Sequence, residues 1–234
     1  MLIVIDYGGY LELIKQHDHA LLAGEMASFA GKPPFSPSTY RTIITAALHD
    51  TSWKESDEQF RDNPHPFTDY PMSEKIKLYK NGIDRMEQID EYVALLTSIH
   101  YTAFFQPDGP EETKQFLLGE KRRQEKLRAK FPHENIELAH QQLKMWDNFS
   151  LYVCLNKPGV QKEHEHPWFK NGIRAVDASG KSIIVDGRWL DEKTVTFSPF
   201  PFVKTWTATI PYMIYDKKTG DFQNRTRKIT FVES

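Results

Sequence analysis

The hydrophobic pattern of the chain changes character once, at residues 156–159 (Asn-Lys-Pro-Gly), and this change constrains the fold more than any other feature. Before it, apolar residues recur at spacings of three and four, as in Leu22, Met26 and Phe29, which is typical of amphipathic helices. After it, short runs rich in β-branched and aromatic residues alternate with turn residues, which is typical of antiparallel strands. The sequence therefore predicts an α+β protein.

The pattern also predicts where most elements begin and end. Helices are expected at residues 11–30, 36–50, 73–88, 90–104, 111–130 and 134–153, with Ser36 as the N-cap of the second and a long loop over residues 51–72. Strands are expected at residues 2–6, 182–189, 193–198, 203–215 and 227–232. We expect a mainly helical domain over residues 1–156, with a C-terminal antiparallel β-sheet of residues 157–234 appended to it and packed on it.

Composition excludes several classes of function. Charged residues make up 26% of the 234 residues, but the formal net charge is only −2, so a nucleic acid polymer is not an expected partner. The single cysteine, Cys154, lies in an apolar run and is expected to be a buried, unreactive thiol. The N-terminus lacks the pattern of a signal peptide, and no segment has the roughly 20 apolar residues of a membrane span. We therefore expect a cytoplasmic protein that does not bind a membrane.

Acidic side chains stand in two helical segments that otherwise look buried. Asp50 follows His49 at the end of the apolar run 43–48, and Asp147 lies between Trp146 and Phe149. A carboxylate in such a position costs free energy unless it is paired with a cation or bound to a metal. These positions are therefore candidates for a site.

Histidines on further predicted helices complete a metal-ligating set. His19 lies in the first predicted helix and His100 near the end of the fourth. Helical proteins build metal sites from side chains on facing helices, and a mixed His and Asp set suits Mn, Fe, Ni, Zn or Mg. His17 competes with His19 for the first position, and His140, two turns before Asp147, is a candidate for the mouth of the site.

The order His, His-Asp, Asp, with each part on a different helix, resembles the HD-domain metal-dependent phosphohydrolases over roughly residues 11–155. The layout is also similar to an uncharacterised bacterial family. Small residues follow His19 (Ala23, Gly24 and Ala27), as the close packing of the first helix in that fold requires. The chain departs from the pattern where Tyr101 follows His100 in place of a histidine pair.

The resemblance implies that the helical domain is HD-like and that the ligands are His19, His49, Asp50 and Asp147. His100 would then lie beside these ligands or serve a second metal. The implied activity is a metal-dependent phosphohydrolase acting on a small phosphorylated metabolite or nucleotide.

Three residues after the doublet complete the predicted catalytic machinery. Asp50 would orient or bridge, Lys54 or a basic residue elsewhere would neutralise charge on the phosphate, and Glu55 or Asp57 would act as general acid or base. The alternative for Lys54, Glu55 and Asp57 is that they are solvated loop charges.

Two other functions fit the same residues. One is a non-catalytic metal- or ligand-binding protein on an HD scaffold, and the other is a di-iron oxygenase-like or lyase-like enzyme. The sequence contains no Gly-rich phosphate loop that would identify a nucleotide. It leaves association into a homo-oligomer open.

Overall fold

The computed structural model describes residues 2–59 and 64–233 of the chain. Its helices are α1 (Gln16–Ser28), α2 (Tyr40–Leu48), α3 (Lys54–Gln59), α4 (Met72–Ile89), α5 (Glu91–Thr102), α6 (Glu111–Arg128) and α7 (Ile136–Leu155), with short 3₁₀ turns η1 (Thr51–Trp53), η2 (Phe67–Asp69) and η3 (Lys162–His164). Its strands are β1 (Leu2–Asp6), β2 (Tyr10–Lys15), β3 (Ile173–Val176), β4 (Ser182–Asp191), β5 (Thr194–Ser198), β6 (Trp206–Asp216) and β7 (Phe222–Phe231).

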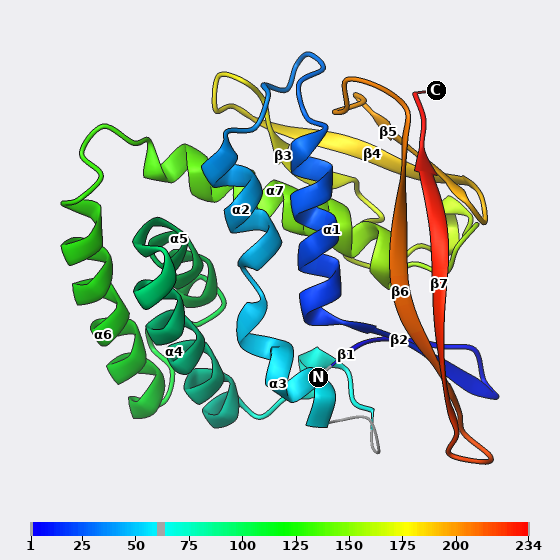
Figure 1. Cartoon of the computed structure of the whole chain (residues 1–234), viewed down its shortest axis with the longest axis horizontal. Helices are drawn as coiled ribbons and strands as arrows, with labels where there is room; N and C mark the ends of the chain where they lie inside the picture. Colours follow the sequence, from blue (N-terminus) through cyan, green and yellow to red (C-terminus); the bar gives the residue numbers. More distant parts are fainter. Residues whose placement is uncertain (1, 60–63, 234) are drawn as a thin grey trace.

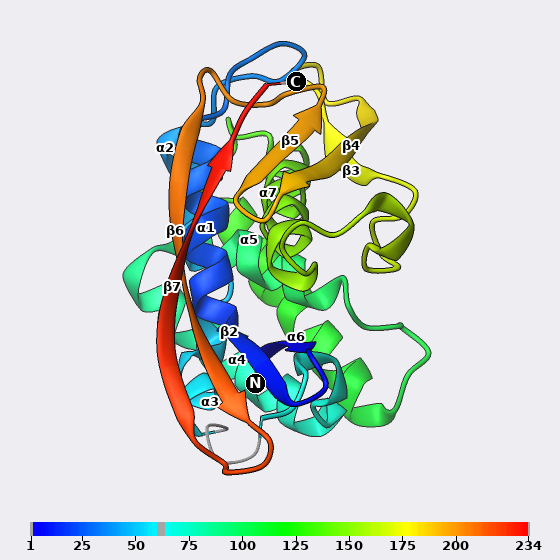
Figure 2. The ribbon, with the colours of Figure 1, turned by 90° about the vertical axis from the view of Figure 1, so that its right-hand side faces the viewer.

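The described strands form one curled sheet in the order β1-β2-β6-β7-β5-β4-β3. The two ends of the chain meet in it, because β2 pairs with β6 and places Leu13 opposite Met213. Neighbouring strands are antiparallel except β5 and β7, which run parallel, with Val195 opposite Phe231. Figure 2 shows β6 and β7 lying across α1, with β4 and β5 beside α7.

The prediction of a helical domain with an appended C-terminal antiparallel sheet is therefore wrong. The sheet takes two strands from the N-terminus, contains a parallel pair, and shares one hydrophobic core cluster with the helices. Residues 11–15 are predicted to belong to the first helix, and Leu, Glu and Lys form helices well, but pairing with β1 and β6 holds them extended. The predicted division between residues 156 and 157 stays a prediction.

Three helices begin at side chains that cap them. Thr39, Asp90 and Asn135 accept hydrogen bonds from the first free backbone N–H groups of α2, α5 and α7. The prediction of Ser36 as the cap of the second helix is wrong, because α2 begins at Tyr40. The described part of the predicted loop at 51–72 contains η1, α3, η2 and the start of α4, and residues 60–63 lie outside the described residues.

A row of stacked aromatic rings connects α7 to α1 through the sheet. Phe149 of α7 stacks on Phe197 of β5 with ring centroids 4.8 Å apart. Phe231 of β7 continues the row to Trp206 of β6, which stacks at 4.4 Å on Phe29, directly after α1. Aromatic stacking adds to the free energy of burial, so the row fixes the positions of the two helices relative to each other.

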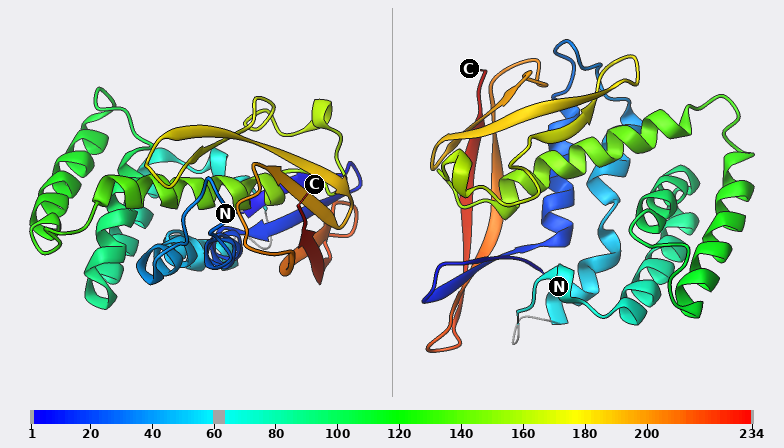
Figure 3. Two further views of the ribbon diagram at one scale, coloured as in Figure 1. Left: turned by 90° about the horizontal axis from the view of Figure 1, so that it is seen from above. Right: turned by 180° about the vertical axis from the view of Figure 1, so that it is seen from behind.

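The helices α4, α5 and α6 lie on the side of the molecule away from the sheet, and α1 and α2 stand between them and β6 (Figure 1). Seen from behind, α7 runs from the side of α6 to the sheet, so it connects the group of helices α4–α6 with the strands (Figure 3). Across the described ranges, 2–59 and 64–233, no helix combines the length and apolar character needed to cross a membrane.

Candidate metal centre

Four helical segments bring the predicted ligands together. His19 lies in the first turns of α1, and His49 and Asp50 lie at the junction of α2 and η1. His100 lies near the end of α5, and Asp147 lies in the middle of α7. All five side chains are buried, with exposed fractions between 1% and 8%. The five residues are called the His/Asp cluster below.

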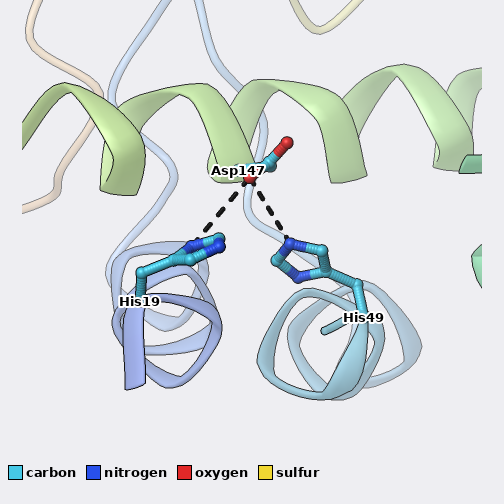
Figure 4. A group of neighbouring side chains, drawn as sticks. All are labelled: His19, His49 and Asp147. Carbon is cyan, nitrogen blue, oxygen red and sulfur yellow. Dashed lines mark ion pairs between the residues drawn. The ribbon is translucent and has the colours of Figure 1, made fainter. Parts of the chain in front are cut away.

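Asp147 is the meeting point of the cluster. Its Oδ1 lies 3.4 Å from Nε2 of His49 and 4.0 Å from Nδ1 of His19. Figure 4 shows the two imidazoles reaching from neighbouring helices toward this carboxylate. One ligand atom from each of the three residues lies within 4.8 Å of the others, a separation at which one ion can contact all three.

Asp50 and His100 extend the cluster on two sides. Oδ2 of Asp50 lies 3.0 Å from Nε2 of His19 and 3.8 Å from Nε2 of His49. Nε2 of His100 lies 3.6 Å from Oδ2 of Asp147, the carboxylate oxygen that faces away from the first two histidines. The second oxygen of Asp147 thus has its own imidazole partner.

Hydrogen bonds at the back of His49 determine which nitrogen faces the cluster. Nδ1 donates to the carbonyl oxygen of Ala46 at 2.8 Å, as metal-ligating histidines commonly do with their outer nitrogen. The Tyr101 hydroxyl donates to the carbonyl oxygen of His49 at 2.6 Å and lies 3.3 Å from Oδ1 of Asp50. The doublet is therefore held in place by hydrogen bonds to Ala46 and Tyr101.

Within the His/Asp cluster, two buried ring nitrogens make no hydrogen bond to a described residue: Nε2 of His49, which lies 3.4 Å from Oδ1 of Asp147, and Nδ1 of His100. A buried polar atom without a partner costs free energy, and a bound cation would remove that cost at His49. The surrounding donors are nitrogen and carboxylate oxygen, which suit Mn, Fe, Ni, Zn or Mg and not a thiolate-bound ion. The residues present therefore fit a divalent metal.

The charges in the cluster also favour a cation. Burial alone would lower the pKa of His49, but the carboxylates of Asp50 and Asp147 outweigh it and raise that pKa to about 9. Burial would raise the pKa of Asp147, but the neighbouring imidazoles, His49 first, lower it to about 2. Burial lowers the pKa of His100 to about 3, so this ring is neutral at pH 7. Both carboxylates are ionised in a buried space, which favours a positive charge between them: the proton on His49 in the metal-free protein, or a metal ion that would displace it.

The cluster lies on the wall of a cavity of about 330 Å³. His19, Asp50, His100 and Asp147 line it, and the rest of the wall is formed by Gln16, Trp53, Phe67, Thr68, Met72, Lys75, Tyr79, Phe104, Phe105, Asn148, Leu151 and Trp168. Lys75 is half-buried, burial lowers its pKa, and its Nζ donates to the carbonyl oxygen of Thr68 at 3.3 Å. A molecule in this cavity would contact both the cluster and an ammonium group.

The three residues predicted after the doublet lie elsewhere. Lys54 and Glu55 are exposed at the start of α3, and Glu55 pairs with Arg85 at 2.5 Å. Asp57 is fully buried and accepts a hydrogen bond from the backbone N–H of His17 at 3.3 Å, and burial raises its pKa to about 7. None of these side chains is among those that line the cavity, so we assign them no catalytic role below.

The alternative histidines are also placed. His17 is half-buried and makes no contact with Asp147 among the ion pairs of the described residues, whereas His19 does. The ring of His140 lies 6.1 Å from that of His100, at the side of the cluster.

Sequence reasoning missed the cavity wall. Lys75 lies 72 residues before Asp147, and Trp168 lies in the loop after α7. Neither residue stands in a sequence pattern that distinguishes it from a solvated residue. Only the arrangement of α4, α5 and the loop after α7 brings them together.

One family model matches the chain. It is described as a protein of unknown function (DUF3891), and it matches residues 2–217. None of the curated proteins and none of the solved structures matches the chain.

Proposed function

This chain belongs to the DUF3891 family of proteins of unknown function, and from its site we propose that it is a metal-dependent phosphohydrolase. The proposed substrate is a small phosphorylated metabolite or nucleotide. The observation that carries the proposal is the buried His/Asp cluster on the wall of a cavity that also contains Lys75. The resemblance to HD-domain phosphohydrolases agrees with it.

The residues that would hold the metal are His19, His49, Asp50 and Asp147, with His100 beside them. A bound divalent ion lowers the pKa of water and polarises a phosphoryl oxygen. The carboxylates of Asp50 and Asp147 would attract the ion, and Nε2 of His49 would bind it, because Nδ1 of the same ring is held by the carbonyl oxygen of Ala46.

Lys75 supplies the second requirement, a positive charge for the phosphate. Lys75 lines the same cavity as the cluster, and its Nζ donates a hydrogen bond to the Thr68 carbonyl oxygen at 3.3 Å. A charge-assisted hydrogen bond from this group to a phosphoryl oxygen would position the ester and stabilise charge that develops during the reaction.

The proposed reaction is hydrolysis of a phosphate ester. The oxygen of water forms a bond to phosphorus while the bond from phosphorus to the ester oxygen breaks. The proton lost by the water ends on the departing oxygen, so the products are an alcohol and inorganic phosphate. The buried side chains of Trp53, Tyr79 and Leu151 line the cavity and would limit the water around the ester.

The test is phosphate release from a panel of phosphoesters by protein loaded with Mn, Zn, Fe, Ni or Mg in turn. Lys75→Met is expected to lower kcat/KM about tenfold or more, because it removes one charged contact, while metal content stays unchanged. Lys80→Met is the matched control, since Lys80 is an exposed lysine on the same helix that pairs with Asp84. Metal-loaded protein that releases no phosphate from any ester would overturn the proposal and favour a non-catalytic binding protein.

A further inference from the structure

Large apolar side chains surround the mouth of the cavity and are exposed to solvent. Met72, Phe104 and Trp168 have exposed fractions of 50%, 54% and 53%, and all three line the cavity. Phe67 joins them, with its ring 6.2 Å from that of Trp168 in an edge-to-face arrangement. These four residues are called the apolar collar. Exposed apolar groups that gather at one cavity mark a binding surface more often than scattered ones do.

The collar comes from three separate parts of the chain. Phe67 and Met72 belong to η2 and the start of α4, Phe104 follows α5, and Trp168 lies in the loop after α7. Phe67 packs against the hydrophobic core, whereas half or more of each of Met72, Phe104 and Trp168 faces solvent. Their convergence on one opening therefore points to recognition.

The loop that carries Trp168 is tied back to α7. The Tyr152 hydroxyl donates to Oε1 of Glu165 at 2.7 Å, and the backbone N–H of His166 donates to the side-chain oxygen of Asn156 at 2.7 Å. The ring of His166 then packs on Trp168 with centroids 5.0 Å apart. Trp168 is thus held by the helix that carries Asp147, which is the preorganisation that a binding site requires.

The exposed fraction of the lining side chains falls from the opening of the cavity to its deepest part. Met72, Phe104 and Trp168 of the collar are about half exposed, whereas the exposed fraction is 2% at Trp53, 5% at Tyr79 and 3% at His100. A ligand that enters therefore meets apolar groups first and the cluster last. The volume, about 330 Å³, is at the lower end of the range for small-molecule pockets, roughly 300–1,000 Å³.

Resting on the proposed function, we propose that the substrate is a phosphate ester of an apolar, ring-bearing alcohol. The ring would pack among Phe67, Phe104 and Trp168, and the phosphate would reach the His/Asp cluster and Lys75. Hydrolysis breaks the bond from phosphorus to the alcohol oxygen, adds the oxygen of water to phosphorus, and releases the alcohol with the proton from that water. The product alcohol carries no phosphate and leaves through the collar.

The experiment compares 1-naphthyl phosphate with glycerol 3-phosphate and adenosine monophosphate on the metal-loaded full chain. The parent is expected to favour 1-naphthyl phosphate in kcat/KM by about tenfold or more, the range that apolar pocket contacts provide. Phe104→Ala and Trp168→Ala are expected to lower kcat/KM about tenfold for 1-naphthyl phosphate and by less than about threefold for glycerol 3-phosphate. Trp168→Phe should keep most of the preference.

Tyr40→Ala is the matched control, because Tyr40 is an aromatic residue with an exposed fraction of 77% that does not line the cavity. Tyr40→Ala is expected to leave kcat/KM unchanged for both 1-naphthyl phosphate and glycerol 3-phosphate. The readout that does not depend on turnover is calorimetric binding of 1-naphthyl phosphate to each variant, with metal content measured beside it. Collar variants should weaken this binding about tenfold while they keep the metal.

The failures of the two proposals can be told apart. Phosphate release that favours glycerol 3-phosphate or adenosine monophosphate, or that ignores the collar variants, would overturn the apolar-alcohol inference and leave the phosphohydrolase standing. Binding of 1-naphthyl phosphate that Trp168→Ala and Phe104→Ala leave unchanged would also overturn the inference. No release from any ester would overturn the proposed function itself.

Discussion

Helices α1 and α2, which carry His19 and His49, approach closely at Gly24. A methyl group at this position would lie 2.5 Å from Cβ of Ala47 and 2.9 Å from its Cα. The second atom belongs to the backbone, so a rotamer change cannot relieve the overlap. We therefore expect Gly24→Ala to push the two helices apart and to lower the free energy of unfolding.

Two opposing effects set the size of this change. Alanine is favoured over glycine in a helix interior by about 1 kcal/mol. Overpacking of a well-packed core costs about 1–3 kcal/mol, and contact with backbone places Gly24→Ala at or above the upper end. The net loss is then about 2 kcal/mol, and for a chain of this size the midpoint of thermal unfolding should fall by roughly 4–8 °C.

The matched control is Gly119→Ala in α6, where a methyl group would meet nothing within 4 Å. Only the helix propensity acts there, so this variant should be more stable by about 0.5–1 kcal/mol. Unfolding in urea, followed by circular dichroism, measures both, and adding Ala47→Gly to Gly24→Ala should restore part of the loss. If Gly24→Ala proved as stable as Gly119→Ala, the close approach of the two helices would be refuted.

Two further predictions concern buried titratable groups. Burial, with Lys144 and Arg128 nearby, lowers the pKa of His140 to about 4, whereas in the unfolded chain it is about 6.5, so the folded state loses stability as pH falls from 6.5 to 4. His140→Gln should reduce the loss in free energy of unfolding between pH 7 and 4.5 by about 1–2 kcal/mol, measured by urea unfolding. Equal losses in the parent and the variant would contradict this prediction. Burial raises the pKa of the Cys154 thiol to about 12, so iodoacetamide at pH 8 should modify this thiol only after the protein is unfolded in guanidinium. Mass spectrometry detects the modification, and rapid labelling of the native protein would contradict the prediction.

Local patterns in the sequence predict the longer helices well. The predicted segments at 73–88 and 111–130 differ from α4 and α6 by two residues or fewer at each end, because spacing of apolar residues and helix-breaking neighbours act locally. The strand β2 was missed because its conformation depends on β6, about 200 residues away, and β3 was missed because its four residues are too few to show a period.

The sequence also identifies which residues gather at the site, for a physical reason. A carboxylate such as Asp50 or Asp147 inside an apolar helical run needs a partner, and histidines on other helices are suitable ones. The structure brings these residues within a few ångströms of one another, and their role as metal ligands stays a prediction. Lys75 and Trp168 could not be identified because they become neighbours of the cluster only through tertiary packing.

Metal content tests most directly whether the His/Asp cluster binds a metal. Elemental analysis would compare the purified protein with Asp147→Asn, which removes the carboxylate charge from the centre of the His/Asp cluster, and with Asp221→Asn, an exposed control on the turn before β7. We predict about one or two ions of Mn, Fe, Ni or Zn per chain in the parent and in the control, and a loss of metal in Asp147→Asn. Metal-free protein after incubation with excess divalent ions, or full retention by Asp147→Asn, would contradict the account.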